Sequence, residues 1–388
     1  MIRVLIADDS AFMRKVLSDL FAKQSDFQVV GTAVNGKDTI DKVKKFQPDI
    51  LTLDVQMPVM DGLEALAIIM DECPLPVVMV SSMTQRGTDA TIRALALGAV
   101  DFVSKAGGPI SKIDTIEDEI LEKCRAAALS HVSKTQSPSK PLVYTSKPAP
   151  APETPPAMKR IEPRRRTGLV LGQKPVIHKI PAPTPVKPIT NQTSNSLSNK
   201  KLVVIGTSTG GPQALQTVIT RLPGDLPCGV VVVQHMPAGF TKSLADRLNS
   251  ISEIAVKEAE NDEIIKAGQV YIAPGNFHLR ISPIAGNGRK IVLSQEPPVG
   301  NHRPAVNVMF DSVAQFGREL VSVIMTGMGC DGCEGMKKIK AHGGYSIAQN
   351  EESCVVYGMP KAVVDAGLAD EIQPLTKIAE AIVEAVRR

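Results

Sequence analysis

Residues 1–125 alternate between short apolar runs and amphipathic stretches. The apolar runs RVLIADD, FQVVGTA, DILTLD, PVVMVSS and DFVSKA have the length and composition of strands. Between them, stretches such as FMRKVLSDLFAK, DTIDKVKKF and TDATIRALALG have the period of amphipathic helices. Strands that alternate with helices predict a parallel sheet covered on both faces. Right-handed crossovers make the doubly wound arrangement the expected one.

The same alternation resumes at Lys201 and continues to the end of the chain. KLVVIG, GVVVVQH, GQVYIAP and RELVSVIMTG are almost continuously apolar, as strands buried on both faces should be. PQALQTVITRL and AVNVMFDSVAQF fit amphipathic helices. The pattern therefore predicts a second doubly wound, Rossmann-like α/β domain.

Between these two blocks the pattern disappears. Residues 131–200 hold twelve Lys and Arg, two Glu and thirteen of the 29 prolines. Such a segment buries too little apolar surface to offset the entropy of ordering it. The sequence thus predicts a domain over 1–128, a disordered linker over 129–198 and a domain over 199–388. RIEPRRRTG in this linker could contact nucleic acid or lipid, but a solubilising role is favoured.

The charge and the composition of the chain limit the classes of partner that we expect. The net charge is +4, but residues 131–200 carry +10, so the rest of the chain carries about −6. There is no Trp, aromatic residues make up 3%, and no helix-turn-helix pattern is visible, which argues against a nucleic-acid partner. No apolar run is long enough for membrane insertion, and the N-terminal run is too short for a signal peptide. Six scattered cysteines indicate reduced thiols, so we expect a cytoplasmic protein. We also expect a monomer.

Polar residues end the strands predicted in the first block. Asp8 and Asp9 end the first strand, Asp54 the third, Ser81 the fourth and Lys105 the fifth. The carboxyl ends of parallel strands share one edge, where ligands bind. Clustered carboxylates need a cation, and oxygen ligands suit Mg²⁺. A carboxylate beside Mg²⁺ can accept a phosphoryl group, whose oxygens a lysine and a hydroxyl would hold.

These residues lie in motifs that resemble the receiver domain of two-component response regulators. The matching pieces are ADDS, LTLDVQMPVMDG, VMVSSM and DFVSKA. The resemblance implies a flavodoxin-like, five-stranded domain that is phosphorylated on Asp54. It implies metal binding by Asp8, Asp9 and Asp54, and switch roles for Ser81, Phe102 and Lys105. No G-x-x-x-x-G-K loop is visible, so the phosphoryl donor is expected to be another protein.

In the second block a serine, a histidine and an aspartate each follow a predicted strand. Ser208 lies in GTSTG, His235 ends VVVVQH, and Asp331 lies in TGMGCDG. Placed on one sheet edge, they form a nucleophile, a general base and a carboxylate that orients the base. G-x-S-x-G spacing also exposes a serine on a sharp turn. Glycines 206, 210 and 211 would allow a tight turn and a close substrate approach.

Three known motifs resemble this serine loop without matching it. GTSTGG is neither a G-x-G-x-x-G fingerprint nor a Walker loop, and the order Ser, His, Asp differs from that of α/β-hydrolases. A purely structural turn stays open. His278 ends no apolar strand, whereas His302 lies in a polar loop that suits substrate binding. His342 is expected to end a helix.

Cys330 and Cys333 form a C-x-x-C. Alone this motif is a weak signal, because zinc needs four ligands and no second pair or C-x-x-H partner stands out. The sequence by itself favours neither a redox nor a metal role.

IGTSTGGPQAL, VVQHMP, GNHRP and MTGMGCDG together resemble the catalytic domain of the chemotaxis protein-glutamate methylesterases. The resemblance implies Ser208 as nucleophile, His235 as base, Asp331 as its partner, and an oxyanion region at Met328 and Thr209. It implies hydrolysis of glutamate γ-methyl esters on chemoreceptors, which releases methanol, and deamidation of certain receptor glutamines. No cofactor is expected for the esterase. The expected partners are chemoreceptors as substrate and a chemotaxis histidine kinase as phosphoryl donor.

The linker is longer than in enteric members of that family, in which the unphosphorylated receiver covers the active site. Because effective concentration falls as a tether lengthens, we expect weaker inhibition here. The competing hypothesis is a response regulator whose second domain binds nucleic acid or another protein. The basic linker favours that alternative slightly.

Overall fold

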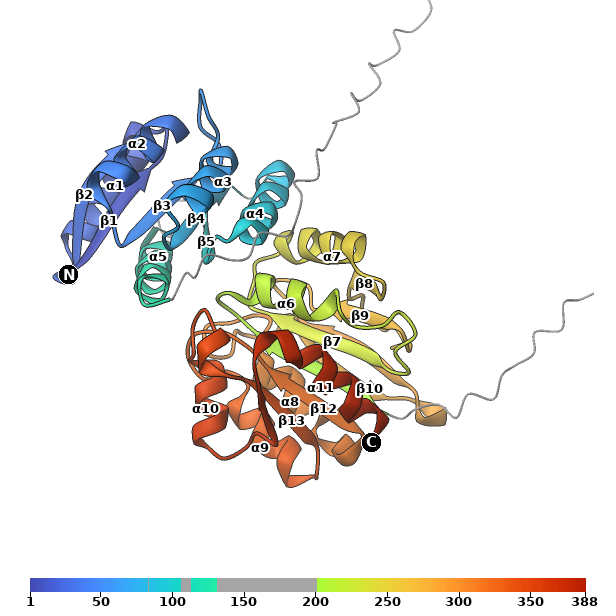
Figure 1. Cartoon of the computed structure of the whole chain (residues 1–388). Helices are drawn as coiled ribbons and strands as arrows, with labels where there is room; N and C mark the ends of the chain where they lie inside the picture. Colours follow the sequence, from blue (N-terminus) through green and yellow to red (C-terminus); the bar gives the residue numbers. More distant parts are fainter. Residues whose placement is uncertain (83, 106–112, 131–200) are drawn as a thin grey trace, which may run out of the picture. The chain divides into compact units, whose positions relative to one another are not determined.

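The computed structural model describes residues 1–82, 84–105, 113–130 and 201–388 (Figure 1). Almost all of the predicted linker, 129–198, lies outside these ranges, so its predicted disorder and the two predicted domain boundaries stay predictions.

The first part is a five-stranded parallel sheet with the order β2-β1-β3-β4-β5. Its strands are β1 (Ile2–Ala7), β2 (Phe27–Ala33), β3 (Ile50–Asp54), β4 (Val77–Ser82) and β5 (Asp101–Lys105). Its helices are α1 (Ala11–Ala22), α2 (Gly36–Phe46), α3 (Gly62–Glu72), α4 (Gln85–Leu97) and α5 (Ile113–Ala128). Strand and helix alternate along the chain, as the apolar pattern predicted.

Successive residues of β1 point to opposite faces of this sheet, and both faces are buried. Val4 packs in a cluster with Phe21 of α1 and Ile120 of α5. Leu5 belongs to the cluster that includes Val43 of α2 and Leu66 of α3. Burial on both faces explains why the strand segments read as continuous apolar runs.

The second part is a seven-stranded, wholly parallel sheet with the order β14-β13-β12-β6-β7-β9-β8. Its strands are β6 (Leu202–Thr207), β7 (Gly229–Gln234), β8 (Ala255–Glu258), β9 (Gln269–Ile272), β12 (Leu320–Ile324), β13 (Tyr345–Gln349) and β14 (Glu371–Gln373). A separate antiparallel pair consists of β10 (His278–Pro283) and β11 (Arg289–Ser294). The sequence did not reveal this pair.

Helices cover both faces of the larger sheet (Figure 1). They are α6 (Gly211–Ile219), α7 (Phe240–Ile251), α8 (Val306–Val313), α9 (Cys333–Ala341), α10 (Met359–Asp365) and α11 (Leu375–Arg387). Val204 packs in one cluster with Phe310 of α8 and Met336 of α9. Val203 packs in the other with Leu215 of α6, beside which α11 lies. The predicted α/β fold of both parts is confirmed.

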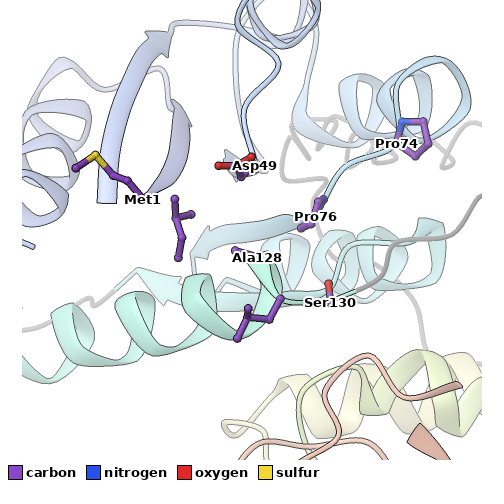
Figure 2. Close-up of a pocket in the computed structure, with 8 residues that line it drawn as sticks. Met1, Asp49, Pro74, Pro76, Ala128 and Ser130 are labelled. Carbon is purple, nitrogen blue, oxygen red and sulfur yellow. The ribbon is translucent and has the colours of Figure 1, made fainter. Parts of the chain in front are cut away.

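A pocket of about 410 Å³ lies in the first part, where β1, β3 and β4 begin (Figure 2). The residues that line it are Met1, Ile2, Asp49, Pro74, Pro76, Ala128, Leu129 and Ser130. It lies at the end of the sheet opposite the predicted acidic centre, and Asp49 is its single ionisable side chain. It therefore has no part in the chemistry argued below.

In the described ranges, no helix is both long and apolar enough to cross a membrane.

Candidate active site and acidic centre

Three neighbouring strands of the larger sheet bring the predicted triad together. β6 lies between β7 and β12. Ser208 directly follows β6, His235 directly follows β7, and Asp331 lies in the loop between β12 and α9. Parallel strands end on the same edge, so residues far apart in the sequence meet there.

The three side chains form a continuous hydrogen-bonded chain. His235 Nδ1 lies 3.2 Å from Ser208 Oγ, and His235 Nε2 lies 2.8 Å from Asp331 Oδ2. An ionised carboxylate can only accept, so Nε2 carries the proton in the neutral imidazole. The lone pair of Nδ1 then faces the serine hydroxyl. This is the geometry that a general base needs.

Four donors hold the carboxylate of Asp331. Besides His235, the backbone N–H groups of Val306 (2.6 Å), Asn307 (2.9 Å) and Gly332 (2.9 Å) donate to it. Val306 and Asn307 begin α8, where the helix dipole favours a negative charge. Burial raises the pKa of Asp331, but its hydrogen bonds with His235 and with the α8 backbone outweigh burial and hold the pKa below its usual value. Asp331 is therefore ionised near neutral pH.

The turn that carries Ser208 depends on its glycines, each for a different reason. Gly210 has φ +77°, which only glycine adopts without strain. A Cβ on Gly211 would come within 2.0 Å of Gln234 Oε1. Gly206 does not turn: it is in β6, and a Cβ there would lie 2.4 Å from Val306 Cγ1. The prediction that Gly206 forms part of the turn is thus wrong. The absence of a side chain at Gly206 instead allows α8 to pack closely on the sheet.

Gln234 is a positioning residue that sequence reasoning missed. Its side-chain amide donates to the carbonyl of Ser208 (3.0 Å) and to that of His235 (3.1 Å). The side chain is buried, so these bonds are protected from competing water. One amide group thereby ties the backbone of Ser208 to that of His235. The available signal was a polar residue at the end of an apolar strand.

The predicted oxyanion donors lie beside the serine. A Cβ on Gly327 would lie 2.8 Å from Ser208 Cβ, so the backbone that leads into Met328 packs against Ser208. The carbonyl of Thr209 accepts a hydrogen bond from Thr326 Oγ1 at 2.9 Å, which fixes the peptide after the serine. Among the described residues, the backbone N–H groups of Thr209 and Met328 have no acceptor. Both are therefore available to a ligand.

Of the alternative histidines that the structure describes, only His302 reaches the triad, where its ring stacks on that of His235. His278 begins β10, is fully buried and lies 3.0 Å from the carbonyl of Pro297 through Nε2. His342 caps the end of α9, as expected. The structure therefore leaves His235 as the histidine that meets the serine.

The smaller sheet gathers the predicted acidic residues at its carboxyl edge. Single oxygen atoms of Asp8, Asp9 and Asp54 lie within 4.8 Å of one another. Lys105 Nζ lies 2.7 Å from Asp54 Oδ2 and 2.9 Å from Asp8 Oδ2. Burial raises the pKa of Asp54, and Lys105 only partly opposes this. Burial lowers the pKa of Lys105, but its bonds with both carboxylates outweigh burial and raise it.

The other predicted switch residues lie on the neighbouring strands. Ser81, near the end of β4, is buried and donates through Oγ to the carbonyl of Gly87 at 3.1 Å. Phe102 is in β5, and its carbonyl accepts from Lys123 Nζ at 2.6 Å. Three carboxylates on a shared edge, with a lysine beside them, suit a small divalent cation such as Mg²⁺.

Comparisons with known proteins find relatives for both folded parts of the chain. The family described as "CheB methylesterase" matches residues 203–382, and "Response regulator receiver domain" matches residues 4–117. A protein-glutamate methylesterase/protein-glutamine glutaminase of Halalkalibacterium halodurans is 44% identical over 389 residues, which cover 100% of this chain and 99% of the relative. A protein of the same name from Symbiobacterium thermophilum is 47% identical, over 99% of this chain and 97% of the relative. This chain belongs to the CheB methylesterase family.

Two solved structures are similar to the separate parts. The CheB methylesterase catalytic domain of Thermotoga maritima is 49% identical and covers 47% of this chain and 97% of that chain, with a TM-score of 0.46. The response regulator domain of Thermotoga maritima CheB is 46% identical and covers 33% and 96%, with a TM-score of 0.31. As a member of the CheB methylesterase family, this protein is an ester hydrolase with a response-regulator receiver domain.

Proposed function

We propose that Ser208 is the nucleophile that hydrolyses glutamate γ-methyl esters on chemoreceptors. The observation that carries this proposal is the position of His235, whose two ring nitrogens face Ser208 and Asp331. The relatives' names supply the substrate class, and the triad geometry supplies the means of attack.

The reaction proceeds through a covalent acyl-enzyme. Ser208 Oγ attacks the ester carbonyl carbon while its proton moves to His235 Nδ1. The N–H groups of Thr209 and Met328 hold the oxyanion that forms. When the intermediate collapses, the C–O bond to the methoxy group breaks, His235 returns the proton to that oxygen, and methanol leaves. Water then attacks the acyl carbon with His235 again as base, which releases glutamate.

The same site would deamidate receptor glutamines. The amide carbonyl takes the place of the ester carbonyl, and His235 protonates the leaving nitrogen, so ammonia departs instead of methanol. The relatives carry both activities in their names, which supports this second reaction.

Regulation is assigned to the receiver, proposed to extend over 1–128, and catalysis to 199–388. A chemotaxis histidine kinase would transfer its phosphoryl group to Asp54. Asp8, Asp9 and Asp54 would hold Mg²⁺, which when bound neutralises charge on the incoming phosphoryl group. Lys105 would bind an oxygen of the phosphoryl group. Ser81 and Phe102 would be the switch residues that respond to phosphorylation. The enzyme would thus catalyse an adaptation step of bacterial chemotaxis.

Methanol release from methylated receptor membranes tests the nucleophile. We expect Ser208→Ala to lower the rate by on the order of 10³-fold or more, since the covalent step is lost. The matched control is Ser250→Ala, whose hydroxyl donates to the carbonyl of Arg247 on the exposed side of α7. Full activity in Ser208→Ala would refute the triad. Phosphoryl label at position 54 in Asp54→Asn would refute the receiver assignment.

A further inference from the structure

Two cysteines flank the catalytic aspartate in the sequence Cys330-Asp331-Gly332-Cys333. The backbone N–H of Cys333 donates to the carbonyl of Cys330 at 3.1 Å, and Gly332 has φ +96°. This hydrogen bond closes a four-residue turn, with Asp331 and Gly332 at its centre. Cys330 and Cys333 stand at the two ends of the turn.

The turn brings the two cysteines within reach of a disulfide. In a hydrogen-bonded turn the first and fourth Cα atoms lie less than about 7 Å apart. A disulfide spans Cα separations of about 4.4 to 6.8 Å. The two thiols can therefore be joined by side-chain rotation and a small adjustment of the turn.

The two cysteines differ in environment in the way that sequential oxidation requires. Cys330 is the exposed one of the six cysteines, all of which are described. Cys333 begins α9, is partly buried, and its Sγ lies 3.4 Å from the carbonyl of Ala362. The remaining thiols are less accessible: Cys124 and Cys228 are buried, and Cys73 and Cys354 are partly buried. A solution oxidant therefore meets Cys330 first.

We propose that a peroxide converts Cys330 and Cys333 into a disulfide that lowers the hydrolytic activity of the neighbouring triad. The Cys330 thiolate attacks the peroxide, whose O–O bond breaks, and becomes a sulfenic acid. Cys333 then attacks that sulfur, the S–O bond breaks, and water leaves. In total two thiols and one hydrogen peroxide give one disulfide and two waters.

The disulfide acts through Asp331. The carboxylate accepts a hydrogen bond from Gly332 N–H within the turn, and it also holds His235 and the start of α8. To form the bond, Cys333 Sγ must leave the carbonyl of Ala362, and the turn must tighten around Asp331. A displacement of about 1 Å in a catalytic group can lower the rate by up to about a hundredfold. We expect a loss of about tenfold to a hundredfold, reversed by a dithiol reductant.

The test uses the full chain treated with hydrogen peroxide. The expected result is a mass loss of two hydrogen atoms, a Cys330–Cys333 linked peptide, and a slower methanol release that dithiothreitol restores. Cys330→Ser and Cys333→Ser should both resist inactivation. Cys73→Ser is the matched control, since this half-buried cysteine lies in the receiver, and it should be inactivated like the parent.

The formation of the disulfide can be tested whether or not the proposed function holds. Only the measurement of lost activity rests on the proposed function. No disulfide in the mass spectrum, an intermolecular disulfide, or irreversible gain of oxygen at Cys330 would overturn the modification site. A complete disulfide with an unchanged rate would overturn the coupling to Asp331. The fate of the triad assignment is decided independently by Ser208→Ala.

Discussion

The ring of His302 lies flat against the ring of His235, the proposed general base, with centroids 3.7 Å apart and planes inclined by 13°. Burial, and next the neighbouring His235, lower the pKa of His302 from 6.5 to about 4. His302 is therefore neutral near pH 7. A neutral, flat partner covers one face of the catalytic imidazole without opposing the positive charge that develops on it during proton transfer.

A cation in place of His302 should impair catalysis. In His302→Arg a permanent charge lies beside His235 and disfavours its protonated form, by about 1 to 4 kcal/mol at contact distance. We expect the rate of methanol release to fall at least about tenfold, since about 1.4 kcal/mol is a factor of ten. His302→Phe keeps a neutral flat ring and is the matched control, with a rate close to that of the parent. Equal rates for the two variants would contradict this electrostatic role.

The same residue should make stability depend on pH. The folded-state pKa of His302 is depressed to about 4, so between about pH 6.5 and 4 the unfolded chain binds a proton that the folded chain does not. Stability should fall over that window as the pH decreases, by about 1 to 3 kcal/mol from this group. Thermal unfolding at several pH values checks this. The catalytic-domain transition of His302→Phe should vary less with pH than that of the parent, and parallel profiles would refute the assignment.

Replacing Asp331 by Asn should separate orientation from packing. The amide is close to the carboxylate in shape, but it removes the charge that stabilises protonated His235 and permits the other tautomer. A loss of about 10² to 10⁴ in kcat is expected, as for other Asp–His pairs of this kind. Circular dichroism and unfolding would confirm that the variant folds. A folded Asp331→Asn enzyme with nearly parental kcat would show that the carboxylate is dispensable.

The sequence predicted the triad because topology alone brings its members together. Ser208, His235 and Asp331 each follow a strand of a parallel sheet, and such strands end on one edge. Gln234 escaped notice because it is the last residue of a buried strand, and its partners are backbone carbonyls that no side-chain pattern announces.

Other contacts between residues that are far apart in the sequence could not be predicted either. The stacking of His302 on His235 depends on a loop path between residues that are far apart in the sequence. The strands of the antiparallel pair β10–β11 are only partly buried, so they lack the continuous apolar runs that marked the strands of the parallel sheet. In the receiver, by contrast, every predicted site residue except Phe102 lies at or just after the end of a strand, so its placement could be predicted from the apolar pattern.

Removing the side-chain amide of Gln234 should loosen the active-site backbone. Gln234→Met keeps the length of the side chain but loses both donors to the carbonyls of Ser208 and His235. Leaving buried carbonyls without donors costs about 1 to 3 kcal/mol of stability. We also expect a lower kcat with a smaller change in KM, because the two catalytic side chains lose their common support. Gln315→Met, at an exposed site near the end of α8, is the control and should leave kcat and stability unchanged. A parental kcat in Gln234→Met would remove Gln234 from the positioning residues.

Replacing Lys105 should make the receiver depend on divalent cations. The Lys105 ammonium lies between the carboxylates of Asp8 and Asp54, and both are buried. In Lys105→Met these carboxylates face each other without compensation, and breaking such a buried pair costs about 3 to 5 kcal/mol. Mg²⁺ can supply the missing positive charge, so it should raise the receiver's melting temperature more in the variant than in the parent. Differential scanning calorimetry with and without Mg²⁺ measures both effects. Lys15→Met, which breaks an exposed pair with Asp19 on α1, should respond to Mg²⁺ as the parent does. An equal Mg²⁺ response in Lys105→Met and Lys15→Met would mean that Lys105 does not compensate the carboxylates of this site.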